Sequence, residues 1–381
     1  MAGQRTTGSY VKQPTGYSAF IPRRLPPHPA IQIDPEMQAL LSKADRALGR
    51  LDGSIQTLPN PELFVFMYVR KEAVLSSQIE GTQASLNDLL AAEAKLHDRS
   101  APSDVHEVVN YVSAFNHGLS RLKELPLSLR LIREIHEKLM TGVRGHNMTP
   151  GEFRTSQNWI GPPGCTLNQA LFIPPPHTEF PGLLGDFEKF LHEPIVMPEL
   201  LKIGLAHAQF ETIHPFLDGN GRVGRLLITF LLCEKNMLIK PVLYLSHYLR
   251  KHRNRYYELL QGTRDRGDYE AWLKFFLNGV TEVSSEATET ARAIVGLRES
   301  HRQLIADKFG MGARNGMRLL EHMFENPYFS VNDVAKRLSI TFVAANNVVK
   351  KLVREKMAVE ITGRYRNRQY SYAPYIKLFG A

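Results

Sequence analysis

The sequence has few cysteines and no segment that is long and apolar enough to span a membrane. Its 381 residues include 2 Cys, Cys165 and Cys233, which cannot form a disulfide framework and do not have the spacing of metal ligands. The best apolar run, residues 226–233, is far shorter than the roughly 20 residues that a membrane helix needs. Residues 1–8 also lack the apolar core of a signal peptide. We therefore expect free thiols in a reducing compartment, no membrane partner and a cytoplasmic location.

Most of the chain also has almost no net charge. The whole sequence carries a net charge of +9, but residues 301–381 hold 14 Lys and Arg against 6 Asp and Glu. The first 300 residues are nearly neutral, with 33 basic and 32 acidic side chains. A basic surface that attracts nucleic acid is therefore expected only in the last fifth of the chain.

Apolar residues recur at a spacing of three to four over much of residues 37–290, which predicts a mainly α domain. Before it, residues 1–36 are rich in proline, which fixes φ and lacks a backbone donor. We expect these residues to form an extended arm, with no element of its own, that crosses the surface of the domain. Residues 291–312 are expected to be a helical linker.

Two parts of the chain depart from this helical rhythm. Within residues 152–175, a run of polar and aromatic residues followed by Gly161-Pro162-Pro163-Gly164 predicts a β-hairpin. Residues 313–381 contain three expected helices, with Ser330 and Thr341 as N-caps of the second and third. Two strand-like runs joined by a basic loop follow them, and this order is typical of a winged helix-turn-helix.

Residues 214–225, HPFLDGNGRVGR, have a composition that a helical core does not need. Gly219 and Gly221 let backbone N–H groups approach a ligand, and the helix that follows adds unpaired donors and the positive end of its dipole. Arg222 and Arg225 are three apart on one face of this helix, where both can reach one polyphosphate. The segment is therefore predicted to bind phosphate groups.

Two further side chains of this segment indicate chemistry. Asp218 is an acid beside an anion site, a placement that favours Mg²⁺ held between a carboxylate and phosphates. His214 is a candidate general base near neutral pH. Each residue alone has an ordinary explanation, such as an N-cap for Asp218, but their joint occurrence within twelve residues favours a site.

The segment resembles the active-site motif of Fic-domain proteins, His-Pro-Phe-x-Asp/Glu-Gly-Asn-Gly-Arg-x-x-Arg, and matches it at every fixed position. The resemblance extends over roughly residues 37–280 and implies a helical bundle with a β-hairpin flap. It also implies Mg²⁺-dependent transfer of AMP from ATP to a Tyr, Thr or Ser hydroxyl of a target protein or of the chain itself. Position 221 is glycine, whereas the Doc-type kinases of the family have a bulkier, lysine-containing loop there.

The resemblance assigns roles to the residues of the motif. His214 would deprotonate the target hydroxyl, Asp218 would hold Mg²⁺, and Phe216 would pack inward and fix the loop. Arg225 would contact the γ-phosphate. The remaining residues of the implied ATP site are Gly219, Asn220, Gly221 and Arg222 at the α- and β-phosphates, with Val223 and Gly224 after them.

A second string, Ser76-Ser77-Gln78-Ile79-Glu80-Gly81, ends a helix expected over residues 62–81. A glutamate in a last helical turn opposes the helix dipole, so Glu80 is better placed if it pairs with a cation elsewhere; the alternative is an exposed glutamate of no consequence. The string resembles the inhibitory helix of the family, with Ser76, Glu80 and Gly81 at its fixed positions. Its place before the core implies self-inhibition through pairing of Glu80 with Arg225.

Two other segments are predicted to take part in binding. Residues 245–257 resemble the segment that lines the adenine pocket of the family, and Lys251 and Tyr257 are the residues chosen from it, although aromatic residues at helical spacing also fit a core. The predicted hairpin corresponds to a flap that binds the extended target segment by strand addition; the alternative is a surface hairpin without a partner.

The third expected helix of residues 313–381 is predicted to carry a polar and basic face. Such side chains contact phosphates and base edges, so DNA is a candidate partner; a protein-docking module and a solvated basic face are the alternatives. The residues of this face are Asn347, Lys350, Lys351 and Arg354, and the basic loop adds Arg364, Arg366 and Arg368.

Three functions fit the sequence. The first is a self-inhibited protein adenylyltransferase, which the intact His214 favours. The second is removal of AMP, or transfer of another phosphate-linked group, by the same site. The third is a DNA-binding regulator whose Fic core senses a nucleotide. A homodimer that controls the inhibitory helix is a further hypothesis.

Overall fold

The computed structural model describes residues 5–56, 58, 61–93, 104–142, 149–162 and 164–379. Two helices, α7 (Glu199–Ile213) and α8 (Asn220–Glu234), form its centre, and almost all of their side chains are buried. A helix that is apolar on every side belongs in a core, which accounts for the run 226–233. In the described part of the chain, no helix combines the length and the apolar character that crossing a bilayer requires.

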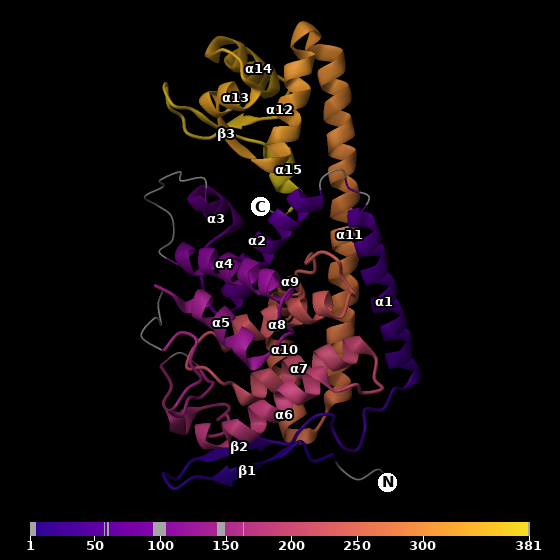
Figure 1. Cartoon of the computed structure of the whole chain (residues 1–381), viewed down its shortest axis with the longest axis vertical. Helices are drawn as coiled ribbons and strands as arrows, with labels where there is room; N and C mark the ends of the chain where they lie inside the picture. Colours follow the sequence, from indigo (N-terminus) through magenta and orange to yellow (C-terminus); the bar gives the residue numbers. More distant parts are fainter. Residues whose placement is uncertain are drawn as a thin grey trace.

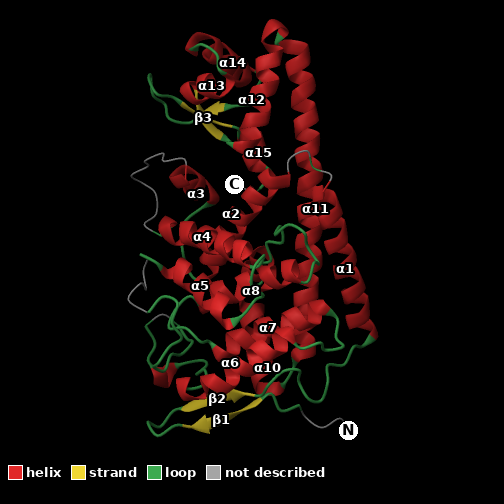
Figure 2. Cartoon of the chain, viewed as in Figure 1, coloured by secondary structure: helices red, strands yellow, loops and turns green. Residues whose placement is uncertain are grey.

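Other helices surround this central pair (Figures 1 and 2), and the predicted mainly α class is confirmed. The expected helix over residues 62–81 is present as α2, which ends one residue before Glu80. The surrounding helices are α1 (Pro35–Gln56), α2 (Pro61–Ile79), α3 (Leu86–Glu93), α4 (Val105–Arg121), α5 (Leu129–Met140), α6 (Phe180–His192), α9 (Ser246–Lys251) and α10 (Arg253–Arg266).

The helix α11 (Tyr269–Lys308) packs along α1 and continues beyond the bundle to the C-terminal unit (Figure 1). The expected linker over residues 291–312 is therefore mostly the second half of this helix. A 3-10 turn, η3 (Gly310–Gly312), follows it and leads into the next helix.

The N-terminal arm contains a hairpin, so the expectation of an arm without any element is wrong. Strand β1 (Gly8–Lys12) pairs antiparallel with β2 (Ser18–Pro22). Pro14 lies in the turn between them and Pro22 ends β2, so neither proline removes a ladder donor from the middle of a strand. The arm does cross the surface of the bundle, where Tyr10 Oη donates to Asp265 of α10 at 2.9 Å.

The predicted β-hairpin over residues 152–175 is reduced to one isolated bridge, between Ile160 and Phe172. Loops and two 3-10 turns, η1 (Leu167–Gln169) and η2 (His177–Glu179), replace the regular strands in and after this segment. Prolines next to the bridge remove ladder donors, so a longer ladder does not form. Pro163 of the predicted turn lies outside the described residues.

Beyond α11, helices pack around a small antiparallel sheet with the strand order β3-β5-β4. The predicted N-caps are confirmed, because the Ser330 side chain accepts a hydrogen bond from Asp333 N–H and the Thr341 side chain accepts one from Ala344 N–H. The elements of this C-terminal unit are α12 (Ala313–Glu325), β3 (Tyr328–Ser330), α13 (Val331–Leu338), α14 (Phe342–Arg354), β4 (Val359–Glu360), β5 (Gln369–Ser371) and α15 (Ala373–Lys377).

The C-terminal unit also contacts the N-terminal helices. The ring centroid of Phe379, which follows α15, lies 5.7 Å from that of Tyr68 and 6.4 Å from that of Phe64, both on α2. In addition, Tyr328 Oη donates to Asn87 Oδ1 on α3 at 2.9 Å. Helix α2 is therefore packed against the helical bundle on one side and the end of the chain on another.

Candidate active site

Residues 214–219 connect the two central helices, and residues 220–225 are the first residues of α8. His214 ends α7 in the left-handed backbone conformation, with φ of 51°, and Gly219 precedes α8 with φ of 77°. Glycine adopts such a φ at little cost, and a Cβ at position 219 would lie 2.9 Å from Met140 Sδ. The first N–H groups of α8 have no acceptor within the helix, so they form the donor-rich helix start that the sequence predicts.

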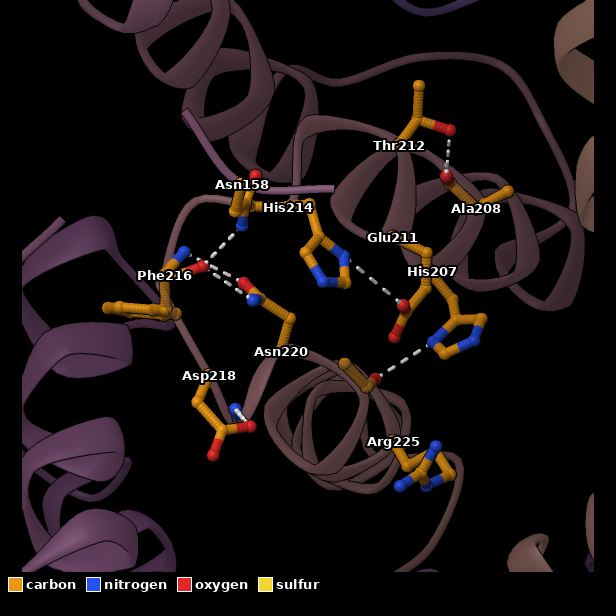
Figure 3. Close-up of polar contacts among 12 residues, drawn as sticks. Asn158, His207, Ala208, Glu211, Thr212, His214, Phe216, Asp218, Asn220 and Arg225 are labelled. Carbon is orange, nitrogen blue, oxygen red and sulfur yellow. Dashed lines mark hydrogen bonds and ion pairs between the residues drawn. The ribbon is translucent and has the colours of Figure 1, made fainter. Parts of the chain in front are cut away.

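The side chain of Asn220 serves the loop itself. Its Oδ1 accepts from the Phe216 N–H at 2.8 Å, and its Nδ2 donates to the Phe216 carbonyl at 2.7 Å (Figure 3). Both ends of the side-chain amide are therefore in use, and the expected phosphate contact of Asn220 stays a prediction for its backbone N–H. Val223 lies in the core, and Gly224 packs against Glu211 of α7.

Phe216 packs inward, as expected, against a histidine that nothing in the sequence singles out. The rings of Phe216 and His136, from α5, are stacked with centroids 3.7 Å apart. The ring of His136 accepts from Gly151 N–H at Nδ1 (2.9 Å), so Nε2 donates to the Asp218 carbonyl (3.0 Å). Burial lowers the pKa of His136 to about 4, so this tautomer is neutral.

His214 is partly buried, and its Nδ1 lies 3.9 Å from Glu211 Oε2. Burial, together with the positive charges of Arg264 and Arg154, lowers the pKa of His214 to about 3. The role of His214 as a general base stays a prediction, and its pKa in this fold lies well below neutral pH. The imidazole is neutral and free to accept a proton, but nearby negative charge is needed to raise its pKa.

The flap segment is tied to the motif by two polar side chains whose role the sequence does not reveal. Arg154 Nε donates to the His214 carbonyl at 3.0 Å, and its Nη2 donates to the Pro175 carbonyl at 2.6 Å. Asn158 Nδ2 donates to the Phe216 carbonyl at 2.8 Å. Arg154 is buried, so these bonds fix the position of the loop 214–219 relative to both ends of the flap segment.

Asp218 is exposed at the edge of the loop, and its Oδ1 accepts from the Gly219 N–H at 2.6 Å. Within the described ranges, no three His, Cys, Asp or Glu side chains gather in a way that would hold a metal ion. An accessible carboxylate beside a phosphate site fits Mg²⁺, because this ion keeps several waters and binds through one or two carboxylates and substrate phosphates.

Arg225 is buried between α8 and α2, where it contacts Glu80, its predicted partner, and also Ser76. Its Nη2 donates to Glu80 Oε1 at 2.6 Å and to the Ser76 carbonyl at 3.0 Å, and its Nε donates to Ser76 Oγ at 2.8 Å. Burial, the largest single effect, disfavours the charged guanidinium, but Glu80 and other nearby groups, Glu211 among them, together outweigh it and keep the pKa of Arg225 above its usual value.

The Glu80 carboxylate also covers the glycine loop. A Cβ on Gly221 would collide with Glu80 Oε1, so this position has room for the carboxylate only because it is glycine. Carboxylate and phosphate oxygens accept the same hydrogen bonds from guanidinium and N–H groups. The acid therefore lies where the motif is predicted to bind phosphate.

Arg222 turns toward a different acid. Its Nη1 donates to Glu107 Oε2 of α4 at 3.1 Å, and its side chain is 3% exposed. The Nε of Arg222 has no hydrogen-bond partner among the described residues. The two motif arginines are thus held by carboxylates from two helices, rather than directed together at one point as the sequence predicts.

A cavity of about 500 Å³ lies beside Glu80, a size typical of small-ligand sites. The end of α2 lines one side with Ile79 and Gly81, and Lys251 of α9 lines another. Lys251 Nζ also donates to Glu282 at 2.7 Å. Tyr257 lies next to Arg253, a further lining residue, whose guanidinium is 5.3 Å from the centre of the tyrosine ring.

Known sequences match the two segments that build this site. Residues 38–120 match the Fic/DOC family N-terminal segment, and residues 126–232 match the Fic/DOC family domain. The chain is 30% identical over 183 residues to a probable protein adenylyltransferase of Aquifex aeolicus, covering 46% of this chain and 52% of that protein. It is 31% identical over 153 residues to the protein adenylyltransferase Fic of Aedes aegypti, covering 39% and 27%. The chain thus spans about half or less of the length of these relatives.

Solved structures share the fold. A Fic family protein from Desulfovibrio desulfuricans superposes with a TM-score of 0.60 at 19% identity, over 90% of this chain and 97% of that chain. A Fic domain containing signaling protein from Bacteroides thetaiotaomicron superposes with a TM-score of 0.51 at 19% identity, over 67% and 95%. The fold, the motif loop and the two matched segments agree, and the chain belongs to the Fic/DOC family as a distant homologue of protein adenylyltransferases.

Proposed function

We propose that this chain is a protein adenylyltransferase that holds itself inactive through Glu80. The observation that carries this proposal is the position of the Glu80 carboxylate, on Arg225 and over Gly221. An acid at this point competes with a triphosphate for the same donors, because both are anions. Its presence supports an anion site whose use is controlled from within the chain, by the inhibitory helix α2.

In the proposed reaction, the helix start at residues 219–222 and the two motif arginines bind the triphosphate of ATP. His214 Nε2 accepts the proton of the target hydroxyl while the hydroxyl oxygen bonds to the α-phosphorus. The bond from the α-phosphorus to the pyrophosphate oxygen breaks, and pyrophosphate leaves with the electron pair. Positioning and neutralisation of charge supply the catalysis, as in other phosphoryl-group chemistry.

Asp218 is the residue that would hold Mg²⁺, because it is the exposed acid of the loop. When bound, the ion would neutralise negative charge on the phosphates. The target segment would lie along the flap, where the side chains of Trp159 and Leu171 are exposed around the Ile160–Phe172 bridge. Extended segments bind such sites through main-chain hydrogen bonds.

The decisive experiment measures intact masses after incubation with ATP and Mg²⁺. It compares the wild type, Glu80→Gly, His214→Ala and the Glu80→Gly/His214→Ala double variant. We expect an AMP-sized gain in Glu80→Gly alone, because this variant frees Arg225 and keeps the base. Equal masses for Glu80→Gly and the wild type, with ATP bound to both, would contradict the transferase and favour a nucleotide sensor.

Removal of AMP is the alternative that uses the same site. Its test starts from Glu80→Gly protein that has been labelled and then mixed with unlabelled wild-type chain and Mg²⁺. Loss of the AMP mass that depends on both Glu80 and His214 of the added chain would assign the reverse reaction to it. A stable label leaves transfer as the activity of the site.

A second candidate function, DNA binding by the C-terminal unit as a winged helix, rests on its exposed charges. Lys350 of α14 and Arg364 and Arg366 of the loop between β4 and β5 are exposed. None of the three has an acidic partner among the residues that the structure describes. Lys351 differs from expectation, because its Nζ turns inward and donates to the Phe309 carbonyl at 2.6 Å.

The DNA proposal is tested with the full chain and a labelled mixed-sequence duplex. We expect affinity to fall steeply between about 50 and 200 mM salt, since phosphate contacts release counterions. Arg364→Ala/Arg366→Ala is expected to reduce the steepness of that fall. No binding at the lowest salt concentration would overturn the proposal and leave a protein-docking role.

A further inference from the structure

We propose that Glu211 is a positioning residue for His214. Its carboxylate accepts the Nδ1 proton of the imidazole and thereby presents Nε2 to the target hydroxyl. This inference deepens the proposed function and rests on it. Glu211 belongs to α7 and precedes His214 by one helical turn, outside the motif that the family resemblance covers.

The geometry places the two groups face to face. Glu211 Oε2 lies 3.9 Å from His214 Nδ1, and Figure 3 shows the carboxylate and the ring directed at each other. His214 Nδ1 and Glu211 Oε1 are both buried and have no hydrogen-bond partner within the described part of the chain. Leaving a buried polar atom without a partner is unfavourable, so closing this gap into a hydrogen bond stabilises the pair.

The two arginines next to Glu211 do not hydrogen-bond to its carboxylate. Arg264 of α10 uses its Nη2 on the Glu211 backbone carbonyl (3.1 Å) and its Nε on Thr212 Oγ1 (3.2 Å). Arg225 of α8 donates to Glu80 and Ser76 instead. A Cβ at Gly224 would collide with Glu211 Oε1, so the glycine of α8 makes room for an acid that packing alone does not require.

The charges around this pair explain why His214 needs an acid. The charged groups that face it are Arg154 from the flap segment, Arg264 from α10, Arg225 from α8 and Glu80, which follows α2. When Nε2 takes the hydroxyl proton, the ring becomes an imidazolium in a buried site beside the positive charges of Arg154 and Arg264. A carboxylate on Nδ1 stabilises that cation and fixes the tautomer with Nε2 unprotonated, as the acid of a serine-protease triad does.

The ionisation of Glu211 makes the support that it gives to His214 depend on pH. Burial raises the pKa of Glu211 to about 7, with the Glu80 charge adding to the rise and Arg225 and Arg264 opposing it. Below this pKa the carboxyl group is neutral and supports the imidazolium less. Substituting Glu80 removes one negative charge, which lowers the pKa of Glu211. The pH at which activity changes is therefore lower in the Glu80→Gly variant.

The test uses the full chain with Glu80→Gly as the active background, and adds Glu211→Gln, which keeps the shape and removes the charge. Glu199→Gln, at the opposite end of α7, is the matched control. We expect Glu211→Gln to lower kcat about 100-fold, the range of general acid–base contributions, with the KM for ATP unchanged. The loss in kcat/KM should grow as pH rises through the Glu211 pKa, whereas Glu199→Gln should have no effect.

A second readout does not depend on activity. The ¹⁵N chemical shifts of the His214 ring, identified by their absence in His214→Ala, report which nitrogen carries the proton. At pH 8 we expect the Nδ1–H tautomer with Glu211 and a mixture or the Nε2–H tautomer with Glu211→Gln. An Nε2–H tautomer in both proteins, or a kcat that Glu211→Gln leaves intact, would overturn the inference.

Stability measurements separate positioning from folding. Replacing a buried carboxylate by a neutral amide is expected to leave the thermal midpoint unchanged or raised, because a desolvated charge is removed. If Glu80→Gly itself shows no AMP transfer, the proposed function fails, and the ring tautomer still decides whether Glu211 orients His214. A pH-independent loss of activity together with a lowered midpoint would count against a positioning role.

Discussion

The guanidinium of Arg222 donates to the carboxylate of Glu107, which lies 115 residues earlier in the chain, at a distance of 3.1 Å. Arg222 is almost fully buried, so the pair neutralises a desolvated charge. Removing one member of such a pair leaves the other uncompensated and costs about 3–5 kcal/mol. Both arginines of the motif are thus balanced by acids from the N-terminal helices.

We predict that Glu107→Gln lowers the thermal midpoint and that polyanions restore it. In this variant Arg222 lacks its counter-charge, and inorganic pyrophosphate or ATP would supply one. Thermal unfolding with increasing pyrophosphate is the measurement, and the midpoint should rise more steeply than in the wild type. Glu124→Gln, which removes an exposed partner of Arg121, is the control and should change little. The same pyrophosphate response in Glu107→Gln and the wild type would disprove the balance of charge.

The contact between Phe379 and α2 predicts that the end of the chain affects the self-inhibition that we propose for Glu80. Phe379 is buried against Phe64 and Tyr68, so Phe379→Ala would cost about 3–5 kcal/mol and endanger folding of the C-terminal unit. Phe379→Leu keeps an apolar side chain and only loosens the contact. We expect it to raise self-labelling with ATP above the wild type and below Glu80→Gly.

Intact masses after timed incubation measure this effect. Phe342→Leu, at an exposed aromatic position of α14, is the matched control and should label like the wild type. Labelling of Phe379→Leu at the wild-type level, with a thermal midpoint that has clearly fallen, would show that α2 is held without help from the C-terminus.

The sequence predicts those parts of the site whose residues are close together along the chain. Residues 214–225 carry their own glycines and arginines, and the residue after α2 is Glu80, so a short string is enough to predict each of them. Their contact was predicted only through the family resemblance, because nothing in either string states that α2 packs on α8. The order of helices followed from apolar spacing for the same local reason.

The residues that the sequence does not reveal act across long separations. His136 meets Asp218 through the packing of α5 on the loop, and Glu107 meets Arg222 through α4; each is an ordinary polar residue of an amphipathic helix. The N-terminal hairpin and the shortened flap were also mispredicted. In both segments, a ladder forms only where the prolines do not take the place of a backbone donor to the partner strand. The sequence of one strand does not reveal which residues of the other strand it pairs with.

A buried histidine predicts how stability changes with pH. His207 Nδ1 donates to the Gly224 carbonyl at 2.9 Å, and Tyr256 Oη donates to its Nε2 at 2.8 Å. Burial lowers the pKa of His207 to about 4, below the value of about 6.5 for an unfolded chain. The unfolded state therefore binds a proton first as the pH falls below 6.5, and the contribution of His207 to stability is lost progressively down to pH 4.

This pH dependence of stability can be measured by comparing the wild type with His207→Gln. The variant does not titrate, so the stability gap between the two proteins should narrow by about 1–1.5 kcal/mol between pH 7.5 and pH 5.5. Urea unfolding at the two pH values measures it. A gap of constant size would mean that His207 keeps its ordinary pKa in the folded chain, and a gap that widens as the pH falls would mean that its pKa is raised there.

The last prediction concerns His136, which holds the loop both by ring stacking and by hydrogen bonds. Substitutions can separate these two contributions. Its ring stacks on Phe216, and its two nitrogens bond to Asp218 and Gly151. His136→Phe keeps the stack but leaves a carbonyl and an N–H unpartnered, at about 1–3 kcal/mol each, whereas His136→Gln keeps a donor and an acceptor. In the Glu80→Gly background we expect His136→Phe to lose kcat by more than tenfold, with His136→Gln restoring part of it, because the Asp218 carbonyl positions the loop that carries the phosphate donors. A kcat that His136→Phe keeps and His136→Gln loses would show that the stacked ring alone positions the loop.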